Sequence, residues 1–249
     1  DTDTDTDTDT DADTDTDADA GSDAGPTMTP ADYDDPTPVE WVALDGGTYL
    51  QGSESMAYPA DYSETPQHSV TVSSFQMLKT EVTCAQYAQC VLDGACEEPL
   101  VAYGEGDAAQ CNWLVWGRED HPVNCVHIWG AEAYCAWLGA RLSSESEWEY
   151  AARSGGKDNE YPWGDTEASC DYAVMNMPYE DEGCGHNHTW PVCSKPLGNT
   201  EQGLCDMAGN VMEWMPDCWY GDYNGAPSDG STWVNGTCDT QVLRGGCYG

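Results

Sequence analysis

The sequence predicts an α+β fold with little regular secondary structure, cross-linked by disulfide bonds and preceded by a low-complexity tail. Thirteen cysteines are scattered from Cys84 to Cys247, whereas the whole chain of 249 residues contains a single Phe. Strand and helix signals are short and are separated by stretches rich in Gly, Pro and Asn. Such a chain is expected to hold its loops in place with cross-links and ions as much as with an apolar core.

Composition divides the chain into an acidic tail, residues 1–38, and a globular domain, residues 39–249. The tail alternates Asp with Thr or Ala over its first 20 residues and holds 14 Asp but no Lys or Arg. Such a segment cannot bury enough apolar surface to offset its conformational entropy. We expect a solvated spacer; the alternatives are a carrier of Thr-linked glycans and an extended strand that adds to a neighbouring molecule.

The charge balance excludes some classes of partner. The chain has 46 acidic and 7 basic residues, a net charge of -39. Without the 14 Asp of the tail, 32 acidic and 7 basic residues remain, a net charge of -25. This surface repels nucleic acid and anionic lipid and attracts divalent cations. No apolar stretch is long enough to span a membrane, so other protein subunits or cell-surface ligands are the expected partners.

Four short strands are predicted at the start of the domain, in two successive pairs. The segments 41–44 and 48–50 flank a turn at Asp45-Gly46-Gly47, and the segments 68–72 and 75–78 form the second pair. Both pairs show the short apolar runs bounded by turn residues that are typical of hairpins.

Three helices are predicted from apolar periodicity and from their end signals. Ser144 and Glu147 fit a capping box at the start of the third helix. Cys90 and Cys96 flank the end of the first helix and are expected to form a disulfide bond. The predicted helices span residues 83–92, 129–138 and 144–155.

An ordered series of motifs runs through the domain. It includes GTYLQG at 47–52, PVN at 122–124, RLSSESEWEYAAR at 141–153, YPWG at 161–164, GLCDMAGNVMEW at 203–214 and RGG at 244–246. In content and order this series resembles the formylglycine-generating enzyme, or sulfatase-modifying factor, family. The resemblance implies a C-type-lectin-related fold of about residues 40–249.

The resemblance also bears on catalysis. In that family a pair of reactive cysteines binds copper and oxidises a cysteine of the substrate. The first of them lies three residues after a Ser whose place is taken here by Cys247, so its position would fall beyond Gly249. Met212 stands where the family usually has Trp. We therefore expect a non-catalytic member without copper; the alternative is an oxidoreductase of the cysteine-oxidising type, or an iron-dependent relative, whose catalytic C-terminal segment is missing from this chain.

The segment 206–213 is the candidate metal site. The resemblance implies Ca²⁺ bound by the side chains of Asp206 and Glu213 and by the backbone carbonyls of Gly209 and Val211. Calcium prefers six to eight hard oxygen ligands of this kind. The alternative is that the two acidic side chains only form salt bridges within the domain, to Arg153 or Arg244.

A second group of metal-ligating residue types is Cys184, His186, His188 and Cys193. Their spacing differs from that of common structural zinc sites. We expect instead a small disulfide loop, closed by Cys184 and Cys193, that exposes the two His side chains.

An odd number of cysteines leaves at least one thiol without an internal partner. Relatives can bridge the position of Cys135 to a C-terminal segment that this chain lacks, so Cys135 is the first candidate for a free thiol. Cys247 is expected to form a structural disulfide or to pair with another chain, the alternative being a reactive cysteine.

These observations predict a secreted or cell-surface protein, because many scattered cysteines indicate an oxidising compartment. Its expected function is that of a non-catalytic, calcium-bound module for binding or assembly. A specific variant is a filament subunit whose Asp/Thr tail docks on the next copy.

Overall fold

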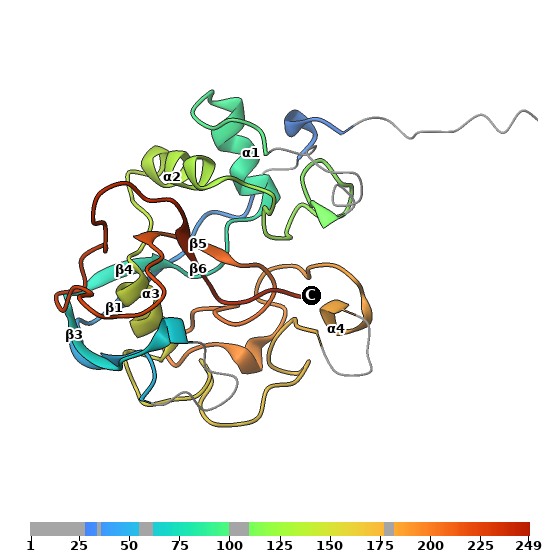
Figure 1. The fold of residues 1–249 in the computed structure, drawn as a ribbon. Coiled ribbons are helices and arrows are strands. Elements are labelled where there is room, and N and C mark those ends of the chain that lie inside the picture. The colour runs from blue at the N-terminus through green and yellow to red at the C-terminus, as the bar shows by residue number, and fades with distance from the viewer. Residues whose placement is uncertain (1–27, 34–35, 55–61, 100–109, 177–181) are drawn as a thin grey trace, which may run out of the picture.

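The computed structural model describes residues 28–33, 36–54, 62–99, 110–176 and 182–249. Short helices and strands lie among long loops (Figure 1), which confirms the predicted α+β class. Among these residues no helix has both the length and the apolar character of a membrane span. The elements in chain order are η1 (Pro30–Asp32), β1 (Trp41–Leu44), β2 (Gly47–Gln51), η2 (Tyr62–Glu64), β3 (His68–Val72), β4 (Phe75–Leu78), α1 (Cys84–Leu92), α2 (Ile128–Trp137), α3 (Glu145–Ala152), α4 (Glu182–Gly185), η4 (Pro196–Gly198), β5 (Glu213–Cys218) and β6 (Gln241–Arg244).

The first four strands form one bent antiparallel ribbon, so the predicted pairing of consecutive strands is wrong. β1 pairs with β4, β2 pairs with β3, and one register runs through both ladders. At the bend, a Cβ atom on Gly46 would lie 2.5 Å from the carbonyl oxygen of Val72 and 2.6 Å from the backbone nitrogen of Ser74. Only glycine allows the two arms to approach so closely. In the sequence, a glycine at a bend of this kind cannot be distinguished from a glycine in a hairpin turn.

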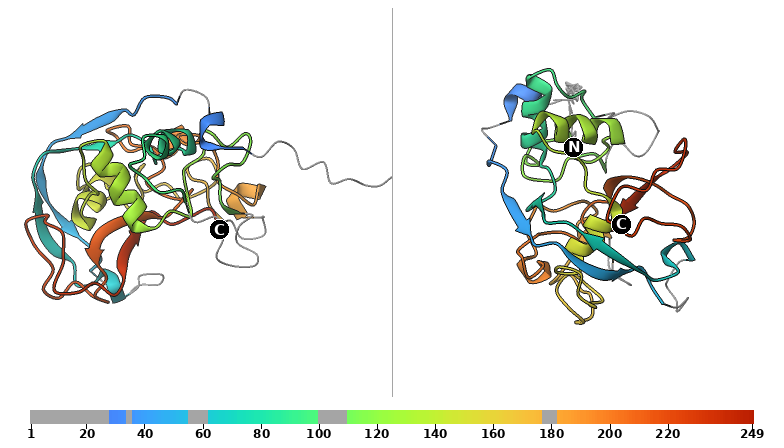
Figure 2. Two further views of the ribbon diagram at one scale, coloured as in Figure 1. Left: turned by 90° about the horizontal axis from the view of Figure 1, so that it is seen from above. Right: turned by 90° about the vertical axis from the view of Figure 1, so that its left-hand side faces the viewer.

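The core consists of three clusters. One lies around α1 and α2, and the other two lie around the ribbon, α3 and β5. The helices α1 and α2 occupy one side of the molecule, and the ribbon with α3 occupies the other (Figures 1 and 2). Representative buried residues are Tyr87, Trp113 and Tyr134 in the first cluster, Leu44, Trp148, Leu204 and Met215 in the second, and Tyr49, Val70 and Tyr150 in the third.

The folded domain begins earlier than the predicted boundary after residue 38. Met28 and Tyr33 are buried in the helical cluster, and the Tyr33 hydroxyl accepts a hydrogen bond of 2.8 Å from the backbone N–H of Leu114. The predicted tail therefore contains a short apolar anchor near its end. The Asp/Thr repeat itself lies outside the described residues.

The three predicted helices are present within a residue or two of their expected starts. Thr83 caps α1 and Ser144 caps α3, each through a capping box. The sequence predicted an apolar stripe on α3, but the structure buries the whole helix, including Glu145, Glu147 and Glu149. These carboxylates are tolerated because each bonds to an arginine.

Five disulfide bonds cross-link the described loops. Cys90 is bonded to Cys96, as expected. The predicted loop closed by Cys184 and Cys193 is wrong, because the two sulfurs belong to different bridges. The remaining four bonds are Cys111–Cys125, Cys170–Cys184, Cys193–Cys205 and Cys218–Cys238.

Candidate functional site

The loop from Asp206 to Glu213 crosses directly over another backbone segment. Asp206, Gly209 and Asn210 all have positive φ angles, of 54°, 86° and 60°. A Cβ on Gly209 would lie 2.4 Å from the carbonyl oxygen of Val174, and this same oxygen accepts the N–H of Asn210 at 2.8 Å. The loop is therefore wound tightly, with backbone conformations that glycine adopts most readily.

Three carboxyl groups lie near one another at this loop, of which Glu81 and Asp206 are buried and Glu213 is half-buried. Glu81, from the segment before α1, accepts hydrogen bonds from Asn210 Nδ2 at 2.6 Å and from the N–H of Val211 at 3.1 Å. Asp206 accepts the N–H of Cys193 at 2.6 Å. Burial raises the pKa of Glu213 to about 7, with a further rise from Asp206. Burial and then the charges of Asp206 and Glu213 raise the pKa of Glu81 well above its ordinary value.

No described Lys, Arg or His side chain forms a salt bridge with any of these three carboxyl groups. Arg153 bonds to Glu149 at 3.0 Å. Arg244 bonds to Glu149, Glu145 and Glu64. The alternative in which Asp206 and Glu213 pair with Arg153 or Arg244 is therefore wrong, and the carboxyl cluster is left without a cation from the described chain.

The donor set of the loop fits a hard cation. A Cβ placed on Gly245 would lie 3.7 Å from the carbonyl oxygen of Val211 and 3.8 Å from Glu213 Oε1, so both oxygens border the space beside Gly245. No three His, Cys, Asp or Glu side chains in the described ranges form a ready-made metal site. Backbone carbonyls must therefore complete any site here, as calcium coordination allows. Asp206, Gly209, Val211 and Glu213 are the residues that would hold the ion.

A buried indole adjoins this space. Trp148 Nε1 faces the carboxyl group of Glu213 and lowers its pKa. It nevertheless makes no hydrogen bond of normal geometry with any described residue. A buried N–H next to a carboxylate favours the ionised form, which is the form that binds a cation.

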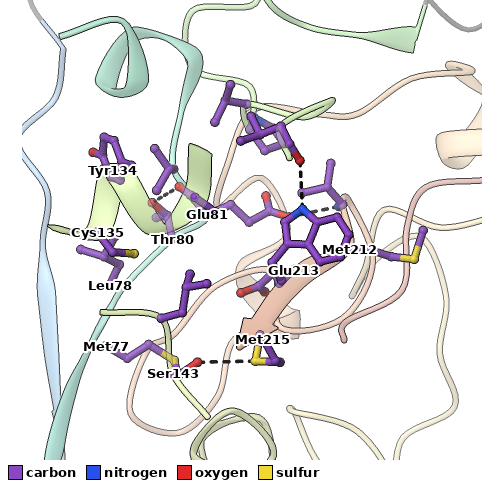
Figure 3. Close-up of a pocket in the computed structure, with 18 of the residues that line it drawn as sticks. Met77, Leu78, Thr80, Glu81, Tyr134, Cys135, Ser143, Met212, Glu213 and Met215 are labelled. Carbon is purple, nitrogen blue, oxygen red and sulfur yellow. Dashed lines mark hydrogen bonds between the residues drawn. The ribbon is translucent and has the colours of Figure 1, made fainter. Parts of the chain in front are cut away.

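A cavity of about 1040 Å³ opens beside the loop. Met77 and Leu78 of β4 lie on one side of it, and Glu213 and Met215 of β5 lie on the other (Figure 3). Its walls are mainly apolar and contain four Met side chains, whose flexibility suits them to adaptable binding surfaces. By size and lining it is the default binding site of the domain; the four Met residues are Met77, Met207, Met212 and Met215.

Two free thiols line the same cavity. Cys135 is unpaired, as expected. Cys247 is also unpaired within the described chain, so a structural disulfide within the chain is wrong for this residue, whereas its pairing with another chain stays a prediction. Burial raises the pKa of Cys135 to about 11, and its thiol is therefore protonated and weakly nucleophilic at neutral pH. A third free cysteine, Cys84, is buried in the helical cluster.

The segment that contains His186 and His188 does not form a zinc site with Cys184 and Cys193. Cys184 is bonded to Cys170 and so offers no thiolate. His188 instead lies next to His121, with ring centroids 5.8 Å apart, over a buried network in which His121 Nδ1 and Thr189 Oγ1 are 2.8 Å apart. This region is part of the packing of the loops.

The sequence did not identify Glu81 as a functional residue, although it lies in the segment directly before α1. Its partners Asn210 and Val211 are far away in the sequence, so neighbouring residues say little about its role. An acidic residue directly before the apolar Val82 and the helix cap Thr83 is the only hint that it is buried.

Known proteins resemble this chain over most of its length. The model of the sulfatase-modifying factor enzyme 1-like domain matches residues 28–249. The formylglycine-generating enzyme of Streptomyces coelicolor is 33% identical over 250 residues, covering 83% of this chain and 78% of that protein. The hercynine oxygenase of Mycolicibacterium smegmatis is 29% identical over 240 residues, covering 83% of this chain and 54% of that protein. The solved structure of PvdO from Pseudomonas aeruginosa superposes with a TM-score of 0.64 at 28% identity, covering 86% and 87% of the two chains.

Proposed function

The chain belongs to the sulfatase-modifying factor enzyme 1-like family, and we propose that it is a calcium-bound extracellular module. It holds a segment of another protein in its apolar cavity without changing that segment chemically. The observation that carries this proposal is the cavity of about 1040 Å³ bounded by the loop 206–213. A bound ion would fix Met212 and Glu213, which line one wall. The five disulfide bonds are compatible with an oxidising compartment.

Binding to the cavity is testable without knowing the natural ligand. Nile red, a neutral dye that fluoresces in apolar surroundings, should bind the calcium-loaded protein with one dominant site. Replacing Met212 with Trp should weaken this binding several-fold, because Met212 lines the cavity and is half exposed, so that a larger side chain narrows the opening without disturbing the core. The measurement is a fluorescence titration.

The matched control for this experiment is Leu197→Trp. Leu197 is 62% exposed and does not line the cavity. It should leave dye binding unchanged. Equal affinity of all three proteins, or no saturable binding to any of them, would argue against a binding function of the cavity.

The disulfide between Cys193 and Cys205 should support the calcium loop. Cys205 directly precedes Asp206, and the N–H of Cys193 donates to the Asp206 carboxylate. We expect the double variant Cys193→Ser/Cys205→Ser to lose about 2 kcal/mol of unfolding free energy and to bind Ca²⁺ several-fold more weakly, as measured by urea unfolding and calorimetry. The double variant Cys90→Ser/Cys96→Ser should lose stability but keep its calcium affinity.

One observation favours a second candidate, an oxidoreductase that acts on a cysteine. The thiols of Cys135 and Cys247 line the same cavity, and characterised relatives include a formylglycine-generating enzyme and a hercynine oxygenase. Incubating the protein with copper, oxygen and a cysteine-containing peptide, followed by mass spectrometry, separates the two candidates. An unmodified peptide is the expected result; conversion of its cysteine would establish catalysis.

The filament variant concerns residues 1–27, which lie outside the described ranges, and it stays a prediction. Light scattering under oxidising conditions with calcium should detect assembly. A monodisperse monomer at high concentration would contradict it.

A further inference from the structure

The loop that joins β5 to β6 contains the sequence Asn235-Gly236-Thr237. An Asn followed two residues later by Thr, with any residue except Pro between them, is the acceptor motif for glycans attached to the Asn amide. The motif is short and arises by chance in many chains, so its structural setting decides whether it has meaning. The setting that it requires is an exposed loop. This loop lies on the left of Figure 1, away from the label C at the end of the chain.

The reacting groups of the motif are free of other contacts. Asn235 and Thr237 are both exposed, and their side chains form no hydrogen bond with any residue that the structure describes. Asn224 in the same loop differs, because its side-chain nitrogen donates to the carboxylate of Asp222 at 2.9 Å. The amide nitrogen of Asn235 can therefore carry a large substituent without breaking an existing interaction.

The backbone at the motif is held in place beside two aromatic rings. The N–H of Asn235 donates to the hydroxyl oxygen of Tyr220 at 2.7 Å, and that hydroxyl donates to the carbonyl of Asn235 at 3.4 Å. The ring of Tyr220 lies 4.3 Å, centroid to centroid, from the ring of Trp233. The disulfide bond Cys218–Cys238 closes the loop around this pair. A group attached to Asn235 is thus presented next to the two rings.

The same loop exposes apolar side chains that the described chain does not cover. Trp219 is 56% exposed, Val234 is 55% exposed and Tyr220 is 37% exposed. A group of exposed apolar residues of this kind indicates a surface that is covered by something else. A sugar ring suits it, because one face of the ring consists of C–H groups, which pack against the negative face of an aromatic ring, while its hydroxyl groups remain in water.

A second motif of the same type, Asn187-His188-Thr189, has a different setting. Thr189 is fully buried. Its hydroxyl accepts a hydrogen bond of 2.9 Å from Asn112 Nδ2 and donates one of 3.2 Å to Asn112 Oδ1. Because the motif is read through its Thr as well as its Asn, a buried hydroxyl makes this segment a poor acceptor in the folded domain. Of the two motifs, the one at 235–237 is the one that presents both groups.

We propose that Asn235 is an N-glycosylation site, and that the first sugar of its glycan packs on the rings of Tyr220 and Trp233. In the transfer, the amide nitrogen of Asn235 bonds to the anomeric carbon of an oligosaccharide that is carried on a lipid diphosphate. The bond between that carbon and the diphosphate oxygen breaks, the lipid diphosphate leaves, and the amide loses one proton. This inference rests on the extracellular location in the proposed function but not on the cavity, which Asn235 does not line.

The site is tested by secreting the whole chain behind a leader peptide from a eukaryotic cell line. Peptide mass spectrometry after digestion with an N-glycosidase, which leaves Asp where a glycan was attached, should find the glycan on Asn235. Asn235→Gln and Thr237→Ala should lose it. The matched control Thr237→Ser should keep it, because Ser also provides the hydroxyl of the motif. Translation in the presence of microsomal membranes gives the same readout for any variant that is not secreted.

The packing of the sugar is tested by thermal unfolding. The glycosylated protein should melt about 2–4 °C higher than Asn235→Gln, the shift that one aromatic contact gives in a domain of this size. In the background of Trp233→Leu most of this difference should disappear. Trp129→Leu is the matched control, because Trp129 is 72% exposed and lies in α2. It should keep the difference.

The outcomes separate this inference from the proposed function. An unmodified Asn235, or a glycan on Asn187 in its place, would overturn the site, even if Nile red binds the cavity. A fully glycosylated Asn235 without dye binding would refute the proposal for the cavity and support the site. A glycan that stabilises the Trp233→Leu and Trp129→Leu variants equally would overturn the packing of the sugar on the aromatic pair.

Discussion

Replacing Arg244 with Leu should lower the free energy of unfolding by about 3–5 kcal/mol, the cost of leaving buried charges without their partner. Arg244 Nη2 lies 2.9 Å from Glu149 Oε2, and Nη1 lies 3.6 Å from Glu145 Oε1. The side chains of Glu149 and Glu145 are only 4% and 8% exposed. Glu149 keeps Arg153 as a second partner, whereas among the described residues Glu145 keeps the hydroxyl of Tyr223, at 2.9 Å, as its remaining side-chain partner.

The loss should depend on pH in a defined direction. Burial already raises the pKa of Glu145, and Arg244 is the strongest influence that lowers it. Without the arginine, the pKa of Glu145 rises further, and its carboxyl group is neutral over more of the pH range. The stability deficit of Arg244→Leu should therefore be smaller near pH 5 than near pH 8.

Two control variants separate the loss of a buried charge partner from other effects of the substitution. Lys157→Ala removes an exposed ion pair with Glu201 and should cost less than about 1 kcal/mol. The double variant Arg244→Leu/Glu145→Gln should recover part of the lost stability, because no unpaired charge remains at residue 145. A deficit that is independent of pH and is not reduced by Glu145→Gln would show that Arg244 acts through packing, for example against the ring of Trp148.

Removing calcium should make the protein less stable as the pH rises. The pKa of Glu213 is about 7 in the folded protein, against an ordinary value of 4.5, so the folded form holds its proton more tightly than the unfolded form. The resulting stability is complete below about pH 4.5 and is lost as the pH rises through about 7, a difference of about 3 kcal/mol. In EDTA, the melting temperature should therefore fall between pH 5 and pH 8. The raised pKa of Glu81 acts in the same direction.

Calcium should oppose this fall, because it binds the ionised carboxylates. Thermal unfolding in saturating CaCl₂ should show a melting temperature that falls less, or rises, over the same pH range. Glu213→Gln should flatten the pH dependence in EDTA and abolish the response to calcium. Glu201→Gln, at an exposed position, corrects for the general repulsion of an acidic chain and should keep both effects. Identical curves for the two variants would contradict a calcium site at the loop.

The same loop connects these predictions to binding. Glu213 is both a candidate calcium ligand and part of the cavity wall, and Met212 beside it is half exposed. Occupation of the loop by an ion would hold this wall in place. We therefore expect calcium to increase the affinity of the cavity for its ligand as well as the stability of the fold.

Features that depend on residues close together in the chain could be predicted from the sequence. The capping box of Ser144 marks the start of α3 because a cap bonds to the backbone only three residues away. Cys90 and Cys96 bridge across a single turn for the same reason. The order of the motifs was sufficient to predict the family. The resemblance to that family in turn indicated the loop 206–213 as the candidate calcium site.

Features that depend on distant segments required the three-dimensional fold. The corner at Gly46 resembles a hairpin turn locally, and only the approach of Ser73 and Ser74 shows that β1 pairs with β4. The partners of Cys184 and Cys193 depend on which loops meet. Likewise, the burial of Glu81 beside Asp206 and the pairing of Arg244 with α3 arise from long-range packing. Local propensities act over a few residues, whereas these contacts form only when the chain has closed its large loops, and many closures are compatible with the same local signals.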